Sequence, residues 1–373
     1  MLNRIPTYVI FLTVVSTVYF FIHFFVYRCL VRELVQDSGL QKALKWFFIV
    51  NGISFFVIQA LNPVFKMRVL NFYSGTWLGV IAISFFIFLL QWVPAKIFPE
   101  YAKRSAILSL IIIGIIAGVS LVNGNLLPRV KRMTIPMKNL PVELKGFKVV
   151  HLSDLHIEAF NSPHRLARIV DKVNRENPDI VVITGDLIDG NVLKTPELGV
   201  ELGRIRAKYG KFVVLGNHDY YGGIKSFYEL VKVAGFKVLI NEMVTAAGSI
   251  QVAGLDDNEG VRRGTGGPDL EKALKGADPS KPLILLYHRP FLFDEAVKKG
   301  VGLQLSGHTH AGQFPPMDII VWVYYKYPWG LFEENGSYIY TSNGTDVWRT
   351  PMRFLSVNEI AVFTLTPPGN SQL

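Results

Sequence analysis

The sequence predicts two parts of different fold class, an N-terminal four-helix transmembrane domain and a C-terminal α/β domain. Half of the 373 residues are apolar and the mean hydropathy is +0.30, which exceeds the usual value for a soluble domain. The apolar excess is concentrated in the first third of the chain. The remainder alternates short β-rich runs with amphipathic stretches, as α/β domains do.

The first third contains four stretches of about twenty or more residues without Asp, Glu, Lys or Arg. A helix of that length spans a hydrocarbon core about 30 Å thick. A cleaved signal peptide does not explain the first stretch, because it is too long and three more follow. We expect a transmembrane domain over residues 1–128, with spans at Thr7–Tyr27, Trp46–Phe65, Val69–Ala95 and Ser105–Pro128.

The formal net charge of +10 could indicate a nucleic-acid partner. However, no run of Lys and Arg interleaved with aromatic residues occurs outside the flanks of the spans, so we expect no nucleic-acid partner. Anionic lipid headgroups explain these charges more simply. The basic residues divide equally between the two ends of the spans, so the positive-inside rule gives no orientation. We expect a multi-pass protein of a cell membrane, the bacterial inner membrane by preference, with the lipid bilayer as partner and no obligate protein partner.

Residues 129–146 are polar and punctuated by proline, which predicts a linker. The α/β domain then covers residues 147–373, long enough to bury its own core. Continuous apolar runs are typical of strands buried on both faces, and apolar residues at helical spacing predict helices. We expect strands at Phe147–Leu152, Ile180–Thr184, Phe212–Leu215 and Leu283–Tyr287, helices at Ser162–Asn177, Pro196–Tyr209 and Ile224–Ala234, and further strands at Tyr338–Ser342 and Ile360–Thr366.

Polar residues of metal-ligand type follow these expected strands at five junctions, where open α/β sheets place their sites. Each junction by itself is weak evidence, because Gly-rich turns carry surface histidines and aspartates for no functional reason. Five in series favour a metal site. The junctions are Asp154-Leu155-His156, Gly185-Asp186, Gly216-Asn217-His218-Asp219, Tyr287-His288 and Gly307-His308-Thr309-His310.

Carboxylates, an amide oxygen and imidazoles together suit Mn²⁺, Fe or Zn²⁺ rather than Ca²⁺. In an extended backbone residues i and i+2 face the same way, so Asp154 would point with His156, and His308 with His310. Two metals in one site lie about 3.5–4 Å apart, and a carboxylate such as Asp186 could bridge them. Spacing alone does not assign ligands to individual ions.

The ordered blocks "SDLH", "GDLID", "GNHD", "YHRP" and "GHTHAGQ" resemble the calcineurin-like metallophosphoesterases over approximately residues 147–365. The resemblance implies two packed β-sheets flanked by helices and a metal-dependent hydrolase of phosphoric esters or pyrophosphates, with two divalent metal ions, Mn²⁺ by preference. It also implies roles for individual residues. Asp154, His156 and His310 would hold one metal, Asn217, His288 and His308 the other, Asp186 would bridge, His218 would protonate the leaving oxygen and Asp219 would orient its ring.

The segment "LKGFKVVHLSDLH", the "GHTHAGQ" block and "PMRFLSVNEI" look similar to a membrane-associated subgroup acting on lipid-linked substrates, including an enzyme that cleaves UDP-diacylglucosamine. The stretch 322–329 places five aromatic residues near the expected metal centre, and it could be core or a membrane and substrate rim. We therefore expect a membrane-anchored phosphohydrolase with a UDP-2,3-diacylglucosamine-like substrate. A broad-specificity phosphodiesterase of the cell envelope, a transporter or receptor with a regulatory phosphoesterase domain, and a scaffold with an inactive site are the alternatives.

Overall fold

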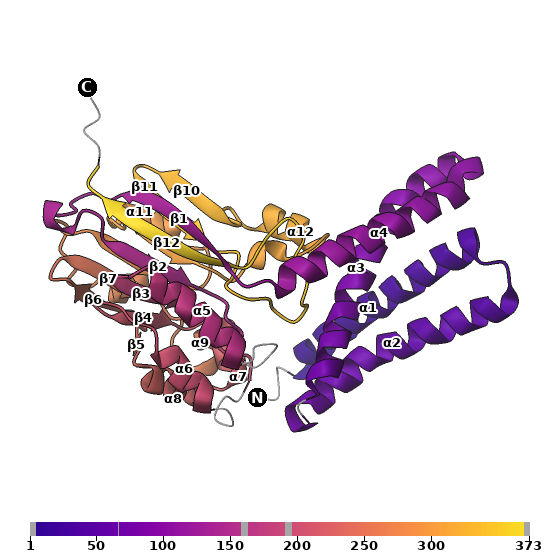
Figure 1. The fold of residues 1–373 in the computed structure, drawn as a ribbon, viewed down its shortest axis with the longest axis horizontal. Helices are drawn as coiled ribbons and strands as arrows, with labels where there is room; N and C mark the ends of the chain where they lie inside the picture. The colour runs from indigo at the N-terminus through magenta and orange to yellow at the C-terminus, as the bar shows by residue number, and fades with distance from the viewer. Residues whose placement is uncertain (1–4, 66, 158–162, 191–195, 369–373) are drawn as a thin grey trace. The chain divides into compact units, whose positions relative to one another are not determined.

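The computed structural model describes residues 5–65, 67–157, 163–190 and 196–368 (Figure 1). The chain forms two compact units. Unit 1 comprises Met1–Asn123 together with two short later segments, Phe314–Pro316 and Arg349–Phe354. Unit 2 comprises Gly124–Gln313, Met317–Trp348 and Leu355–Leu373. The expected fold class, four long apolar helices and a two-sheet α/β domain, is confirmed.

Unit 1 is built from four long helices that are apolar enough to cross a membrane. Each helix begins before the uncharged stretch that predicted it, because flanking polar and basic residues continue the helix. The fourth helix ends at Asn125, before the predicted end of its span at Pro128. A Pro-initiated 3₁₀ turn at Pro99–Tyr101 joins the last two helices. The four are α1 (Ile5–Leu34), α2 (Ser38–Phe65), α3 (Arg68–Ile97) and α4 (Ala102–Asn125).

Several polar side chains inside unit 1 pair with one another or with backbone. The ring of His23 bonds through both nitrogens, with Nδ1 2.9 Å from the carbonyl oxygen of Tyr19 and Nε2 accepting from the indole N–H of Trp77 at 2.9 Å. The side-chain amide of Gln59 donates to Asn71 Oδ1 at 2.7 Å. Such pairs satisfy polar groups in apolar surroundings and hold helices together. His23 is therefore a structural residue of the bundle.

The segment Arg349–Phe354 packs against the transmembrane helices, and we call it the docking segment. Two glycines of α3 make room for it: a Cβ on Gly75 would collide with the carbonyl oxygen of Arg349, and a Cβ on Gly79 with the sulfur of Met352. The guanidinium of Arg349 donates to Gln59 Oε1 at 2.6 Å. A segment that is distant in sequence is thus an integral part of the helical unit.

Unit 2 contains two six-stranded sheets. In the first, β2, β3, β4 and β5 are parallel, β12 pairs antiparallel with β2, and β1 pairs parallel with β12. Its order is β1 (Arg129–Pro136), β12 (Glu359–Thr366), β2 (Lys148–Leu152), β3 (Ile180–Thr184), β4 (Lys211–Val214) and β5 (Lys237–Val238). The second has the order β10 (Gly330–Glu334), β11 (Ser337–Thr341), β9 (Leu303–Ser306), β8 (Leu283–Leu286), β7 (Ile250–Gly254) and β6 (Glu242–Ala246).

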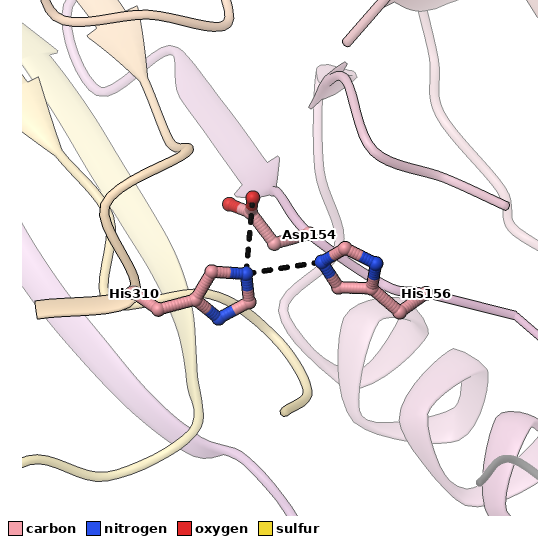
Figure 2. Close-up of side chains that lie close together, drawn as sticks. All are labelled: Asp154, His156 and His310. Carbon is pink, nitrogen blue, oxygen red and sulfur yellow. Dashed lines mark hydrogen bonds and ion pairs between the residues drawn. The ribbon is translucent and has the colours of Figure 1, made fainter. Parts of the chain in front are cut away.

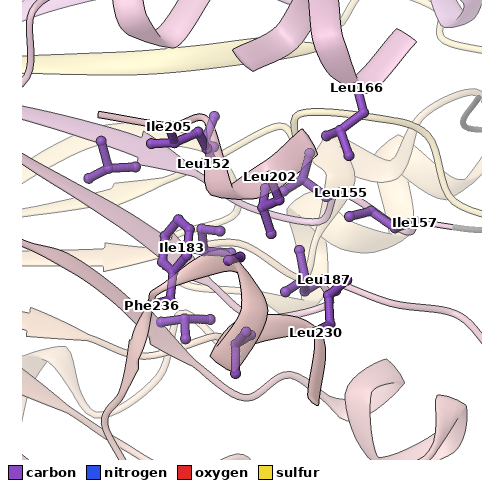
Figure 3. Close-up of a cluster of buried hydrophobic side chains, with 14 of the residues drawn as sticks. Leu152, Leu155, Ile157, Leu166, Ile183, Leu187, Leu202, Ile205, Leu230 and Phe236 are labelled. Atoms are coloured by element: carbon purple, nitrogen blue, oxygen red, sulfur yellow. The ribbon is translucent and has the colours of Figure 1, made fainter. Parts of the chain in front are cut away.

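The two sheets share a buried apolar core, because strands of both contribute to one cluster that includes Val149, Val182, Val252 and Leu286. The opposite face of the first sheet is covered by helices α5 (Pro163–Arg175), α6 (Pro196–Gly203) and α8 (Ile224–Ala234) (Figure 1). Figure 3 shows leucine and isoleucine side chains from these helices and from β2 and β3 filling this layer. Strands buried on both sides explain why the parallel runs are continuously apolar.

The other helices of unit 2 are short and connect the strands. They are η3 (Val142–Leu144), α7 (Asn217–Gly222), α9 (Glu259–Arg263), α10 (Leu270–Ala273), α11 (Phe293–Lys298), η5 (His310–Gly312) and α12 (Met317–Tyr324).

The expected linker at 129–146 is corrected by the structure. Residues Arg129–Pro136 form β1, whose whole length pairs with β12 at the C-terminal end of the domain. The prolines at 136 and 141 follow the strand and lead into η3, so they mark a turn rather than a tether. An edge strand with an alternating polar pattern gives little sequence signal, because solvent covers part of it. Unit 2 accordingly begins near Gly124 instead of at residue 147.

Candidate metal centre

The candidate ligands lie directly after five strands that come from both sheets. β2, β3 and β4 are parallel neighbours, as are β8 and β9, so their carboxyl ends meet at one edge of each sheet. The residues that follow are Asp154 and His156 after β2, Asp186 after β3, Asn217 after β4, His288 after β8, and His308 and His310 after β9.

The backbone at these positions is not extended, so the argument from an extended strand does not apply, although Asp154 and His156 do reach the same cluster as expected. Asp154, His156, Asp186, His308 and His310 all have positive φ, between 44° and 71°. A non-glycine residue in this region costs roughly 1–2 kcal/mol. Strain of this kind is found where the surrounding structure fixes a functional geometry. His308 and His310 reach two different clusters.

The first cluster consists of Asp154, His156 and His310, each at most 5% exposed. Figure 2 shows the two imidazoles pointing toward one another, with their Nε2 atoms 3.0 Å apart. Nε2 of His310 also lies 3.4 Å from Asp154 Oδ1. The backbone N–H of His308 donates to both carboxylate oxygens of Asp154 at 3.1 Å, which fixes the position of this carboxylate.

The second cluster consists of Asp186, His288 and His308. Nε2 of His288 lies 3.3 Å from Asp186 Oδ2 and 3.0 Å from Nδ1 of His308. The amide oxygen of Asn217 is 3.2 Å from the same nitrogen. The structure thus brings all seven predicted metal-site residues into two adjacent groups.

Asp186 lies between the two clusters. Its Oδ2 is 3.3 Å from Nε2 of His288 and 4.0 Å from Nε2 of His156. Its Oδ1 accepts a hydrogen bond from the backbone N–H of His218 at 2.8 Å. The carboxylate is therefore oriented by the chain so that one oxygen faces both groups, which is the geometry that a bridging ligand needs.

The donor set fits divalent cations of borderline hardness. Nδ1 of His288 donates to the carbonyl oxygen of Thr184 at 2.8 Å, and Nδ1 of His156 lies 2.7 Å from Asp189 Oδ1. Since these partners hold the proton on Nδ1 when the rings are neutral, the Nε2 atoms that face the clusters would then offer their lone pairs to a cation. Nε2 of His156 lies 3.0 Å from Nε2 of His310, and Nε2 of His288 lies 3.0 Å from Nδ1 of His308. Each of these close pairs of nitrogen atoms needs a cation or a proton between the two atoms. The only cysteine, Cys29, lies in α1 and offers no thiolate here.

Two glycines allow the loops to close around the carboxylates. A Cβ on Gly216 would collide with the carboxylate of Asp186, and a Cβ on Gly307 would collide with the side chains of Ser153 and Asp154. Neither residue has a positive φ. These two glycines are therefore required by close approach rather than by an unusual turn.

His218 lies beside the first cluster, and Asp189 holds its ring. Nδ1 of His218 is 2.8 Å from Asp189 Oδ1, which also contacts His156. The rings of Tyr221 and Trp348 flank the imidazole edge to face, each with a centroid distance of 5.4 Å. The carboxylate of Asp189 thus positions both His156, a candidate metal ligand, and His218, the candidate general acid.

Asp219 does not orient His218, contrary to the expectation from sequence. Its Oδ1 accepts from the backbone N–H groups of Leu187 and Ile188, and its Oδ2 accepts from that of Gly216. It joins the loop after β3 to the start of α7. The sequence offered both Asp189 and Asp219 near the ligands, but adjacency to His218 in the chain favoured the wrong one, because neighbouring side chains on a helix point in different directions.

Arg289, the residue after His288, is a further site residue that sequence reasoning left without a role. Its Nε and Nη2 donate to the two oxygens of the buried Asp257 at 2.7 and 3.1 Å. Its Nη1 lies 3.3 Å from Nε2 of His308. Asp257 holds one edge of the Arg289 guanidinium, and Nη1 at the other edge faces the second cluster. A guanidinium held in this way is suited to bind an anionic oxygen. The "YHRP" block contained this signal, because an Arg beside a ligand seldom serves packing alone.

Opposing influences set the charges of the buried groups. Burial disfavours protonated His156, but the charges of Asp189 and Asp186 outweigh burial and raise its pKa to about 9. Burial likewise opposes protonation of His288, while Asp186 raises its pKa to about 10. Burial works against ionisation of Asp189, yet His156 and His218 lower its pKa. In the metal-free chain His156 and His288 therefore carry protons at neutral pH.

Metal binding should release protons near neutral pH. The ligand form of His156 and His288 is neutral, whereas their raised pKa values keep both protonated in the metal-free chain. A cation must displace these protons, so its apparent affinity should rise with pH until the pKa values of both groups, about 9 and about 10, are passed. Calorimetric titration with Mn²⁺ in two buffers of different ionisation enthalpy measures the number released. Equal heats in both buffers would contradict the prediction.

Comparison with known proteins agrees with this geometry. The model of the calcineurin-like phosphoesterase family matches residues 147–312. A transmembrane protein with metallophosphoesterase domain from Danio rerio is 36% identical over 274 residues, which cover 70% of this chain and 63% of that protein. An uncharacterized metallophosphoesterase of Helicobacter pylori strain J99 is 36% identical over 246 residues, 65% of each chain.

The chain thus spans slightly less than two thirds of these two relatives. It spans nearly all of an uncharacterized metallophosphoesterase of Campylobacter jejuni, at 30% identity over 381 aligned positions that cover 96% of this chain and 98% of the relative. With the family motifs assembled into two ligand clusters, the chain belongs to the calcineurin-like metallophosphoesterase family.

Proposed function

We propose that this protein is a membrane-anchored phosphohydrolase with two divalent metal ions, Mn²⁺ by preference, that cleaves a phosphodiester or pyrophosphate bond in a lipid-linked substrate. The observation that carries the proposal is the pair of ligand clusters joined by Asp186, in a chain that also contains four candidate membrane spans. Asp154, His156 and His310 would hold one ion, Asn217, His288 and His308 the other, and Asp186 both.

When bound, the two cations would supply Lewis acidity toward the phosphate oxygens and lower the pKa of a shared water. The chain itself supplies three further elements. Arg289, held by Asp257, presents Nη1 to a phosphate oxygen that does not react. His218 gives a proton to the leaving oxygen. Asp189 keeps the ring of His218 in place and stabilises its protonated form.

The lipid-linked substrate is supported by the four spans, since they keep the catalytic unit at a bilayer at all times. Aromatic rings near both clusters offer surfaces for the organic part of such a substrate: Tyr221 and Trp348 beside His218, and Tyr325 with its ring centroid 6.1 Å from that of His308. The proposed location is the bacterial inner membrane. UDP-2,3-diacylglucosamine combines a pyrophosphate, a nucleotide and acyl chains, and is the substrate that we propose to test first.

The decisive experiment follows release of UMP from UDP-2,3-diacylglucosamine by the detergent-purified protein with Mn²⁺. Bis-p-nitrophenyl phosphate is assayed in parallel, and Asp186→Asn serves as the blank. Release of UMP that is lost in the variant supports a lipid pyrophosphatase. Hydrolysis of the generic diester alone would overturn the proposed substrate and favour a broad-specificity phosphodiesterase. No metal-dependent hydrolysis of either compound would overturn the proposed activity.

A further inference from the structure

Helix α12 is apolar on every side and exposed. It follows directly after the loop of His310 and has the sequence MDIIVWVY. Trp322, Val323 and Tyr324 are 66–72% exposed, and within this described helix no side chain is buried. A helix that is apolar all round normally lies in a protein core or in lipid. The aromatic stretch at 322–329 is therefore split, because Tyr327 is buried in the core while Trp322 and Tyr324 are not.

The chain ties α12 to the transmembrane unit. The three residues before it, Phe314–Pro316, belong to unit 1, and the buried Phe314 is part of the same apolar cluster as Ile81 and Phe88 of α3. An eight-residue helix is about 12 Å long. No part of α12 can therefore lie far from a residue that is packed among membrane-spanning helices.

An exposed apolar side chain also occurs at another point where the chain passes from unit 1 to unit 2. The docking segment ends at Phe354, and the chain re-enters unit 2 at Leu355, which is 84% exposed. An isolated exposed leucine needs no explanation. Helix α12 and Leu355 follow two of the places where the chain returns from unit 1 to unit 2, and their exposed apolar side chains favour lipid as the medium that they meet.

The position of α12 beside the metal centre is fixed by its packing. A Cβ on Gly312 would collide with the backbone of Asp318, so the first turn of the helix rests on the loop that carries His310. Just after the helix, Tyr325 stacks on Phe291 and approaches the ring of His308. The helix thus runs between segments that reach both ligand clusters.

We infer that α12 is an interfacial helix that inserts its Ile, Trp, Val and Tyr side chains into the bilayer and contacts the acyl chains of the substrate beside the metal centre. Tryptophan and tyrosine prefer the headgroup level of a membrane. Asp318 is the only Asp, Glu, Lys or Arg in the helix, and it lies in the first turn. The inference rests on the proposed function for the substrate, but the insertion itself does not require catalysis.

The insertion is tested with the full-length protein in phosphatidylethanolamine and phosphatidylglycerol vesicles. In a Cys29→Ser background, Trp322→Cys is labelled with an environment-sensitive fluorophore, and lipids with a nitroxide near the headgroup act as quencher. Val200→Cys is the matched control, because Val200 is 63% exposed on α6 of the same unit. We expect a blue-shifted, lipid-quenched label at 322 and a water-like, unquenched label at 200.

A water-like label at 322 would overturn the inference. A blue shift without quenching by lipid would also overturn it, because a second copy or another protein would then cover the helix. The substrate contact is tested separately with Trp322→Ser/Val323→Ser. The rate on a vesicle-embedded lipid-linked substrate should fall about tenfold, equivalent to about 1.4 kcal/mol, while the rate on soluble bis-p-nitrophenyl phosphate should be unchanged. Equal rates on the lipid substrate would exclude the acyl contact, and failure of the wild type to cleave that substrate would count against the proposed function alone.

Discussion

Asp186→Asn is expected to abolish hydrolysis, with kcat on bis-p-nitrophenyl phosphate lowered by more than about 10³-fold. The substitution keeps the shape of the side chain and an acceptor for the backbone N–H of His218. It removes the negative charge that faces His288 at 3.3 Å and His156 at 4.0 Å. A single lost interaction with developing charge typically costs about 10²–10³-fold, and Asp186 faces both clusters. Steady-state kinetics with Mn²⁺ measure the loss.

Metal analysis of the same variant distinguishes a site defect from misfolding. The metal content after dialysis should fall below two ions per chain, while the circular dichroism spectrum stays that of the wild type. Asp171→Asn is the matched control, because Asp171 is a surface carboxylate on α5 that is 47% exposed and pairs with Arg204. Two retained ions with wild-type kcat in Asp186→Asn would show that Asp186 does not bridge.

His218→Asn should slow hydrolysis to an extent that depends on the leaving group. Protonation by a positioned side chain contributes about 10²–10⁴-fold, and an alkoxide needs that proton far more than p-nitrophenolate does. The loss should therefore be about 10²-fold or more on an alkyl phosphodiester and small on bis-p-nitrophenyl phosphate. Bound metal should stay at the wild-type level, since His218 belongs to neither of the two proposed ligand clusters and instead groups with Asp189 and His156. An equal loss on both substrates would contradict the assignment of His218 as the acid.

Two carboxylate variants separate positioning from folding. Asp189→Asn should reproduce the dependence on leaving group in a weaker form, because Asp189 contacts the ring of His218 at 2.8 Å. Asp219→Asn should instead lower the melting temperature, because its carboxylate accepts three backbone N–H bonds that join two loops. If Asp219→Asn rather than Asp189→Asn showed the leaving-group effect, the geometric assignment would be wrong.

The docking segment gives the membrane unit a connection to the metal centre through the chain. Trp348, whose ring contacts His218, exchanges two hydrogen bonds with the side chain of Gln313 at 2.9 and 3.0 Å. Gln313 is followed by Phe314, and Trp348 is followed by Arg349. Phe314 and Arg349 are the first residues of the two later segments that belong to unit 1. Substitutions at Gly75 or Gly79 would therefore test whether packing inside the helical unit affects turnover.

The sequence by itself predicted the four long apolar helices, six of the strands (β2, β3, β4, β8, β11 and β12) and the candidate metal ligands. Each of these signals is local: uncharged apolar length for α1 to α4, continuous apolar runs for β2, β3 and β8, and ligand residues directly after strands. Burial on both faces or in lipid forces such runs to be apolar, so the pattern survives in a single sequence.

Only the tertiary structure decided how distant residues meet. Spacing alone left the ligands unassigned, and the structure has His308 and His310 in different clusters, as the family resemblance implied, with left-handed backbone at both residues. The tertiary structure also placed Asp189 rather than Asp219 on His218, turned residues 129–136 into an edge strand, and carried residues 349–354 into the helical unit. These features depend on pairings across many residues of chain. Local propensity does not encode them, because their stabilisation arises only when the partner segment is already in place.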